Sequence, residues 1–186
     1  MQVAPPSRPW ARDLLRFWFH ELQPSDWFGS GEEVDRGLRV RFGRTLAMMA
    51  HRPTSEFLSD PATARAAILL FDQVPRNLFR DDPRAFATDR KAAALTRAFL
   101  SRGWHRGLDA NARQFVAMPL MHSERIADQR LGLAFFARER LYDTLRFARA
   151  HHCMIASFRR FPHRNAVLGR ETSAKEKRAI DAGFAW

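Results

Sequence analysis

The fold class is decided by the stretch Trp10-Ala-Arg-Asp-Leu-Leu-Arg-Phe-Trp-Phe-His-Glu-Leu22 near the N-terminus. Its large apolar residues recur at intervals of three and four positions, which places them on one face of an α-helix. Pro24 follows shortly afterwards and favours a helix end at this point. We therefore predict an amphipathic helix here, with its wide apolar face at the centre of the fold.

Helical spacing of apolar residues continues through the rest of the chain, and no window alternates as a strand requires. End signals support these helices, such as Asp60-Pro61 as an N-cap followed by proline, and Pro75 as a stop. Further helices are expected over about 34–49, 61–75, 88–103, 109–117, 123–136, 140–161 and 173–182. We predict an all-α fold of about seven to nine helices whose short connections favour a bundle or stacked antiparallel hairpins.

Length and cysteine content narrow the class of protein. The 186 residues suit a single domain spanning residues 1–186. The only cysteine, Cys153, excludes an internal disulfide and cysteine-rich zinc ligation, and we expect it to be buried in a helix. With neither a signal-peptide pattern nor a long apolar run, the sequence predicts a soluble cytoplasmic protein that has no membrane partner.

The net charge of +11 raises the question of nucleic-acid binding. Nearly all of the basic residues are arginines, and they are spread along the whole chain instead of being gathered in one arm or helix. A composition bias toward arginine produces the same pattern. We therefore predict no specific nucleic-acid partner, and only weak adhesion to DNA or RNA at low salt.

Polar residues gather around a proline in three segments near predicted helix ends. The segments are Phe71-Asp-Gln-Val-Pro-Arg-Asn-Leu-Phe-Arg80, Met118-Pro-Leu-Met-His-Ser-Glu124 and Phe158-Arg-Arg-Phe-Pro-His-Arg-Asn-Ala-Val-Leu-Gly-Arg170. A buried arginine needs an anionic partner because unpaired charge is costly in the interior. We therefore predict that the three segments assemble one polar site.

Ten residues of these segments and of the helix that follows are candidates for the site. Arginine would supply charge for an anion, asparagine would orient a ligand, and histidine with a carboxylate would transfer protons. The catalytic candidates are His122, Glu124 and His163, and the ligand-binding candidates are Asp72, Arg76, Asn77, Asp128, Arg164, Asn165 and Arg170. A structural alternative stays open, because arginine and asparagine can also bind carbonyl groups left open where proline ends a helix.

Glu124 and Asp128 are four positions apart, so on one helix face they could share a metal ion or a proton. In the alternative, Ser123 and Glu124 cap the helix and Asp128 pairs with an arginine. Signatures of phosphate-binding loops, dinucleotide folds, zinc proteases and serine hydrolases are absent from the sequence. We predict no cofactor and no bound metal.

The chain resembles a bacterial family known as domain of unknown function 924, over nearly everything from Leu14 onward. The resemblance is carried by Phe17-Trp-Phe19, Trp27-Phe28, Leu69–Arg80, Arg84-Ala-Phe-Ala-Thr-Asp89, Pro119–Glu124, Ala127-Asp-Gln129 and Arg160–Arg170. It implies an all-helical fold of the tetratricopeptide-like superfamily, an array of antiparallel helical hairpins. It implies no activity.

Three functions remain open. From the residues, we predict a small polar or anionic ligand at the three proline segments. The first alternative is a hydrolase that uses His122 or His163 as a base. The second is a scaffold for a protein partner, which the tetratricopeptide-like resemblance suggests.

Overall fold

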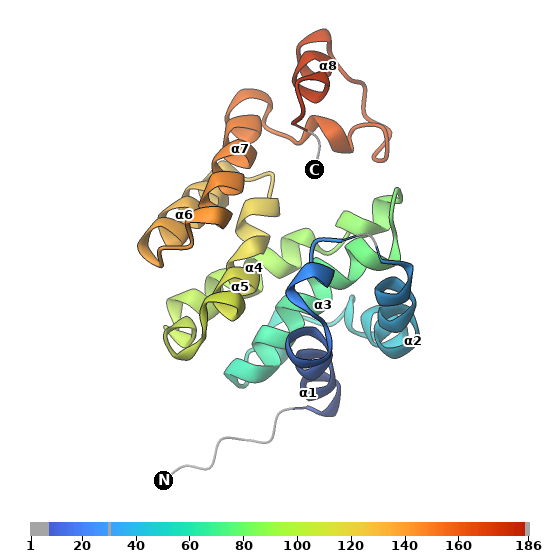
Figure 1. Cartoon of the computed structure of the whole chain (residues 1–186), viewed down its shortest axis with the longest axis vertical. Helices are drawn as coiled ribbons and strands as arrows, with labels where there is room; N and C mark the ends of the chain where they lie inside the picture. The colour runs from blue at the N-terminus through green and yellow to red at the C-terminus, as the bar shows by residue number, and fades with distance from the viewer. Residues whose placement is uncertain (1–7, 30, 185–186) are drawn as a thin grey trace.

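The computed structural model describes residues 8–29 and 31–184, and all regular structure in these residues is helical. The α-helices of this part are α1 (Pro9–Arg16), α2 (Glu32–Met49), α3 (Pro61–Leu78), α4 (Asp89–Ser101), α5 (Ala110–His122), α6 (Ile126–Arg138), α7 (Tyr142–Phe158) and α8 (Ala174–Asp181). From α2 to α7 each helix packs against the next one along the chain, as short connections dictate (Figure 1). The all-α prediction is confirmed, whereas membership of the tetratricopeptide-like superfamily stays a prediction.

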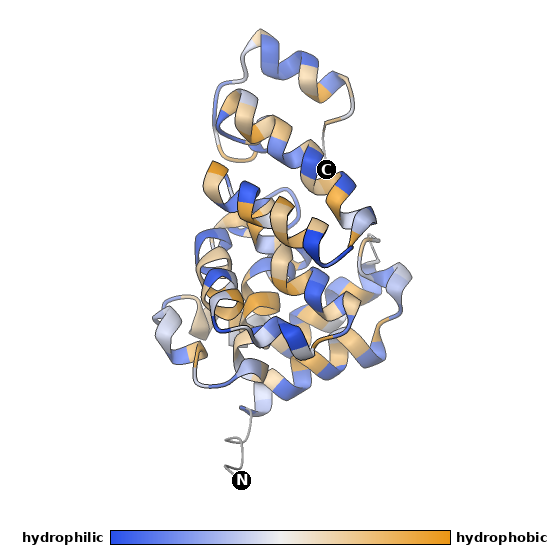
Figure 2. Cartoon of the chain, turned by 90° about the vertical axis from the view of Figure 1, so that its left-hand side faces the viewer, coloured by the Kyte–Doolittle hydropathy of each residue, from blue (hydrophilic) through white to orange (hydrophobic). Residues whose placement is uncertain are grey.

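The centre of the fold is α3, and the apolar face of the first helix packs against it within the main core. Helix α3 contacts α1, α2, α4 and α5, and nearly all of its residues from Thr63 to Pro75 are buried. A helix surrounded in this way needs apolar or small residues on all faces, and the run Ala66-Ala-Ile-Leu-Leu-Phe71 meets that need. Most other helices carry apolar and polar residues on different faces (Figure 2).

Pro75 and Pro119 lie inside α3 and α5, so the prediction that these prolines end the helices is wrong. Pro75 lacks the N–H that would bind the carbonyl of Phe71, four residues earlier. The Thr88 hydroxyl donates to that carbonyl at 2.7 Å and replaces the missing bond. Helix α3 therefore continues past the proline and carries Arg76 to the start of α4.

The helices of the C-terminal third enclose a smaller hydrophobic cluster of their own. Buried Met154, Ile155 and Phe161 form it, with partly buried residues of α6 and α8 packed around them. Helix α7 ends at Phe158, three residues earlier than expected, because Arg159 adopts a left-handed conformation with φ of 59°. The chain then turns back over the α5–α6 junction (Figure 1).

Two smaller expectations have opposite outcomes. The capping box predicted at Ser173 and Glu176 opens α8 as expected. Cys153 was expected to be buried, but it lies exposed on α7.

In the part of the chain described, no helix is long and apolar enough to cross a membrane.

Candidate functional site

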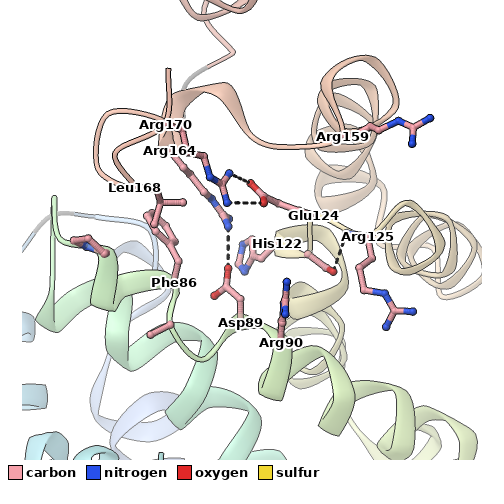
Figure 3. A pocket seen from close by; sticks show the side chains of 13 residues that line it. Phe86, Asp89, Arg90, His122, Glu124, Arg125, Arg159, Arg164, Leu168 and Arg170 are labelled. Carbon is pink, nitrogen blue, oxygen red and sulfur yellow. Dashed lines mark hydrogen bonds and ion pairs between the residues drawn. The ribbon is translucent and has the colours of Figure 1, made fainter. Parts of the chain in front are cut away.

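A cavity of about 390 Å³ opens where α4, the α5–α6 junction and the loop after α7 meet (Figure 3). It is lined by Pro83, Phe86, Ala87, Asp89, Arg90, His122, Ser123, Glu124, Arg125, Arg159, Arg164, Leu168 and Arg170. Four predicted candidates, His122, Glu124, Arg164 and Arg170, are among them. Asp72 and Arg76 lie directly behind this wall, so the three proline segments do meet in one place.

Buried ion pairs join three elements behind the cavity. Asp89, in the first turn of α4, receives Arg76 of α3 and Arg164 of the loop, each at 2.9 Å. Arg76 also lies 3.4 Å from Asp72. The Arg164 guanidinium is sandwiched between the rings of Phe86 and Phe161, 4.4 Å from each centroid. Burial lowers the pKa of Arg164 to about 10 although Asp89 opposes the shift, so the arginine stays charged at neutral pH.

His122 ends α5 and is held by the fully buried Asp72. Its Nδ1 lies 2.8 Å from Oδ1 of Asp72. Burial opposes ionisation of Asp72, but His122 and Arg76 outweigh it and lower the pKa of Asp72 to about 2. The ionised carboxylate therefore accepts a hydrogen bond from Nδ1–H of His122, which leaves Nε2 of this cavity-lining residue as a potential acceptor. No other residue of the described chain is hydrogen-bonded to that Nε2 atom.

Glu124 ties the C-terminal loop to the α5–α6 junction. Its two oxygens accept from Arg170 at 2.8 and 3.0 Å, and Oε1 also accepts from the backbone N–H of Phe161 at 3.0 Å. Burial opposes ionisation of Glu124, but Arg170 and the Phe161 N–H outweigh it and lower its pKa. Glu124 is thus an ionised anchor for the loop over the cavity.

Glu124 and Asp128 do not share a helix face, so that prediction is wrong. Helix α6 begins only at Ile126, two residues after Glu124. Asp128 binds Arg97 and the hydroxyl of Ser123, each at 2.8 Å, and does not line the cavity. The alternative is right in pairing Asp128 with an arginine and wrong in its helix cap, because Arg125 is the N-cap residue of α6 and no side chain caps this helix. Among the described residues, no three of His, Cys, Asp and Glu are grouped so that they could hold a metal ion.

Three further candidates lie outside the cavity lining. Asn77 donates to the carbonyl of Gln73 at 3.0 Å, and the buried Asn165 donates to the Thr172 hydroxyl at 3.2 Å. Asn77 therefore binds a carbonyl near the helix end, as the structural alternative proposed, whereas Asn165 binds a side-chain hydroxyl within the loop. Burial, and after it the charge of Arg164, lowers the pKa of His163 to about 4, which keeps this histidine neutral at pH 7.

Asp89 and three arginines of the cavity rim, Arg90, Arg125 and Arg159, were not among the predicted site residues. Asp89 lies in the first turn of the helix predicted over 88–103, where the helix dipole alone explains an acidic residue. The three arginines had no signal in the sequence that set them apart from surface arginines. They are exposed, and none of them has an acidic partner in the described part of the chain.

The cavity carries an excess of positive charge. Five arginines and two carboxylates line it, and both carboxylates are already paired with arginine. The N-terminus of α6 borders it at Ser123 to Arg125 and adds its partial positive charge. Burial, and after it the nearby His122, lowers the pKa of His151 behind this region to about 3. The region therefore favours anions and keeps buried histidine neutral.

Comparison with known proteins gives a family and a structural relative. The model of a family described as bacterial protein of unknown function (DUF924) matches residues 14–183. The solved structure of a protein of unknown function from Agrobacterium tumefaciens is 30% identical and has a TM-score of 0.85, covering 93% of this chain and 97% of its own. No curated protein matches the chain. The chain therefore belongs to the bacterial family of unknown function DUF924.

Proposed function

We propose that the cavity binds a small anionic ligand. The observation that carries this proposal is the set of rim arginines, Arg90, Arg125 and Arg159, which line the cavity and have no acidic partner in the described chain. Guanidinium groups bind phosphate and carboxylate with paired hydrogen bonds, and such bonds are stronger when both partners are charged. Because these arginines are exposed, water solvates them until an anion arrives.

The size and composition of the cavity support the same function. Its volume of about 390 Å³ lies within the range of small-molecule sites. Its inner wall is fixed, since Arg164 and Asp89 are held by ion pairs and by ring stacking. A pre-formed wall lowers the entropy that binding must overcome. The exposed thiol of Cys153 suits a reducing compartment, so we infer a cytoplasmic ligand.

Thermal unfolding with inorganic phosphate tests the proposal. A ligand that binds only the folded state stabilises it, and at about 100 times Kd the unfolding midpoint should rise by about 5 °C or more. The double variant Arg90→Gln/Arg125→Gln should lose most of this rise. Chloride at matched ionic strength separates binding from charge screening.

The matched control is Arg36→Gln/Arg44→Gln on α2, which removes the same charge from exposed arginines that do not line the cavity. This control should keep the phosphate effect of the parent. If both double variants respond to phosphate as the parent does, the cavity is not an anion site.

A second candidate function is proton transfer by His122 in a hydrolase. The buried Asp72 holds Nδ1 of His122, and this arrangement orients a general base toward a substrate in the cavity. His163 is the weaker candidate because it does not line the cavity.

Hydrolysis of chromogenic phosphate and carboxylate esters tests this second function. His122→Gln should lower any turnover by about 100-fold or more, while phosphate still stabilises the variant. If the parent protein binds phosphate but hydrolyses none of these esters, the hydrolase function is overturned and the anion-binding function is kept.

A further inference from the structure

A second cavity of about 440 Å³ adjoins the first. The linings of the two cavities share Glu124 and Arg159, so these two side chains stand at their boundary. Arg164 and Arg170 lie on one side of Glu124, and Arg125 and Arg159 lie on the other (Figure 3). The two cavities are therefore neighbouring parts of one recess.

The second cavity has fewer charged lining residues than the first, two arginines and one carboxylate against five arginines and two carboxylates. Helices α6 and α7 supply it with Ile126, Ile155 and Ala156 as apolar lining residues. Ile155 is 2% exposed and belongs to the smaller hydrophobic cluster, so the wall here is the edge of a packed core. Arg130 and His152 complete the lining. An apolar wall next to a cationic cavity suits a ligand that has both an anionic and an apolar part.

At the boundary between the two cavities, the Glu124 side chain is held in place and the Arg159 side chain is free to change rotamer. Glu124 is held by two hydrogen bonds from Arg170, and its charge is neutralised there. Arg159 is exposed at the end of α7 and has no side-chain partner in the described residues. A long unpaired arginine can change rotamer at little cost, so a ligand can extend from one cavity into the other without breaking an ion pair.

On the basis of the proposed function, we propose that the ligand is an organic anion with a short apolar body. Its phosphate or carboxylate group lies in the first cavity among the rim arginines. Its apolar body lies in the second cavity against Ile126 and Ile155. Water that covers the more exposed apolar residues of this lining, Ile126 and Ala156, is then released, which adds hydrophobic free energy to the ionic contacts.

The proposal is tested by comparing inorganic phosphate with phenyl phosphate in titration calorimetry. Full burial of a phenyl-sized group contributes enough to tighten binding about tenfold or more. We therefore expect phenyl phosphate to have a Kd at least about tenfold below that of phosphate. Equal affinities of the parent for the two compounds would overturn the inference and leave the anion site intact. Failure of both compounds to bind would overturn the proposed function as well.

A blocking variant locates the apolar part. Ala156 is exposed on α7 and lines the second cavity, so Ala156→Trp fills this space without entering the core. We expect this variant to bind phosphate as the parent does, within about twofold, and to lose the tenfold advantage of phenyl phosphate. The control is Ser157→Trp, at the next exposed position outside the lining, which should keep the advantage.

Two results of the blocking experiment would overturn the inference. In the first, Ala156→Trp weakens phosphate and phenyl phosphate equally, so the second cavity makes no separate contribution. In the second, both tryptophan variants keep the full advantage of phenyl phosphate. The comparison of the two ligands in the parent needs no variant, so it decides the proposal even if Ala156→Trp does not fold.

Discussion

The arginines of this site form two groups, one buried and paired with carboxylates and the other exposed and without an acidic partner in the described chain. Arg76 and Arg164, behind and within the inner wall, share the carboxylate of Asp89. The rim arginines Arg90 and Arg125 lie in solvent without such a partner in the described chain. Burial explains the difference, because an unpaired charge is costly in the interior and nearly free in water. Inner arginines therefore determine stability, and rim arginines are available for a ligand.

The largest expected effect comes from removing the shared carboxylate. Asp89→Asn leaves Arg164, whose side chain is 7% exposed, without its anionic partner. Breaking a buried pair from one side typically costs about 3 to 5 kcal/mol. We expect a loss of this size in the free energy of unfolding, measured by urea denaturation.

A double variant separates the unpaired charge from the loss of packing. In Asp89→Asn/Arg164→Met, the methionine keeps an apolar chain between Phe86 and Phe161 while the stranded charge is gone. We expect the double variant to be more stable than Asp89→Asn alone. If the double variant is less stable than Asp89→Asn alone, the Arg164 guanidinium stabilises the fold through its stacking on the two rings and not through the ion pair.

The second prediction concerns the protonation of the buried His151 at low pH, which adds a positive charge behind the cavity. The folded pKa of His151 is about 3, lowered from its ordinary value of 6.5 first by burial and then by the charge of His122. Between these two values the unfolded chain binds a proton that the folded protein does not, so stability falls as the pH drops below 6.5. From pH 7 to pH 4 the loss from His151 should be about 3 kcal/mol.

His151→Gln should reduce this acid sensitivity, measured as the difference in unfolding free energy between pH 7 and pH 4, by about the 3 kcal/mol that His151 contributes, and should leave the part due to His163. The neighbouring His152→Gln is the matched control and should keep the sensitivity of the parent. Equal acid sensitivity of all three proteins would mean that His151 is not the group that titrates, and the inner region would then tolerate added charge.

The sequence could predict which segments meet. It could not predict which of their residues are buried in ion pairs and which line the cavity. Helical spacing and the three proline segments were sufficient for the all-α class and for the meeting of His122, Glu124 and Arg164. The ends of helices were less predictable, because the missing bond of Pro75 is replaced by Thr88, a residue of another element. Such a replacement depends on the tertiary structure and leaves no local signal.

The missed residues have a similar explanation. Asp89 looks like an ordinary acidic residue in a first helical turn, and only the fold shows that two arginines converge on it. Arg90, Arg125 and Arg159 are indistinguishable in the sequence from the other surface arginines of a chain with a net charge of +11. Their importance comes from sharing one cavity, which is a property of the assembled fold.

The smallest effect on stability is expected at the rim, where Arg159 has a left-handed backbone with φ of 59°. Glycine adopts this conformation without strain, so Arg159→Gly should raise the free energy of unfolding by about 0.5 to 1 kcal/mol. Arg140→Gly is the matched control, since Arg140 is also exposed, has φ of 58° and lies at the end of α6 away from the cavity. The two variants should gain similar stability without ligand, measured by thermal unfolding. With phosphate the two variants should differ in stability, because only Arg159→Gly removes a cation from the lining of the proposed anion site. An equal phosphate effect in both would place Arg159 outside the binding site and restrict the anion to the other arginines of the first cavity.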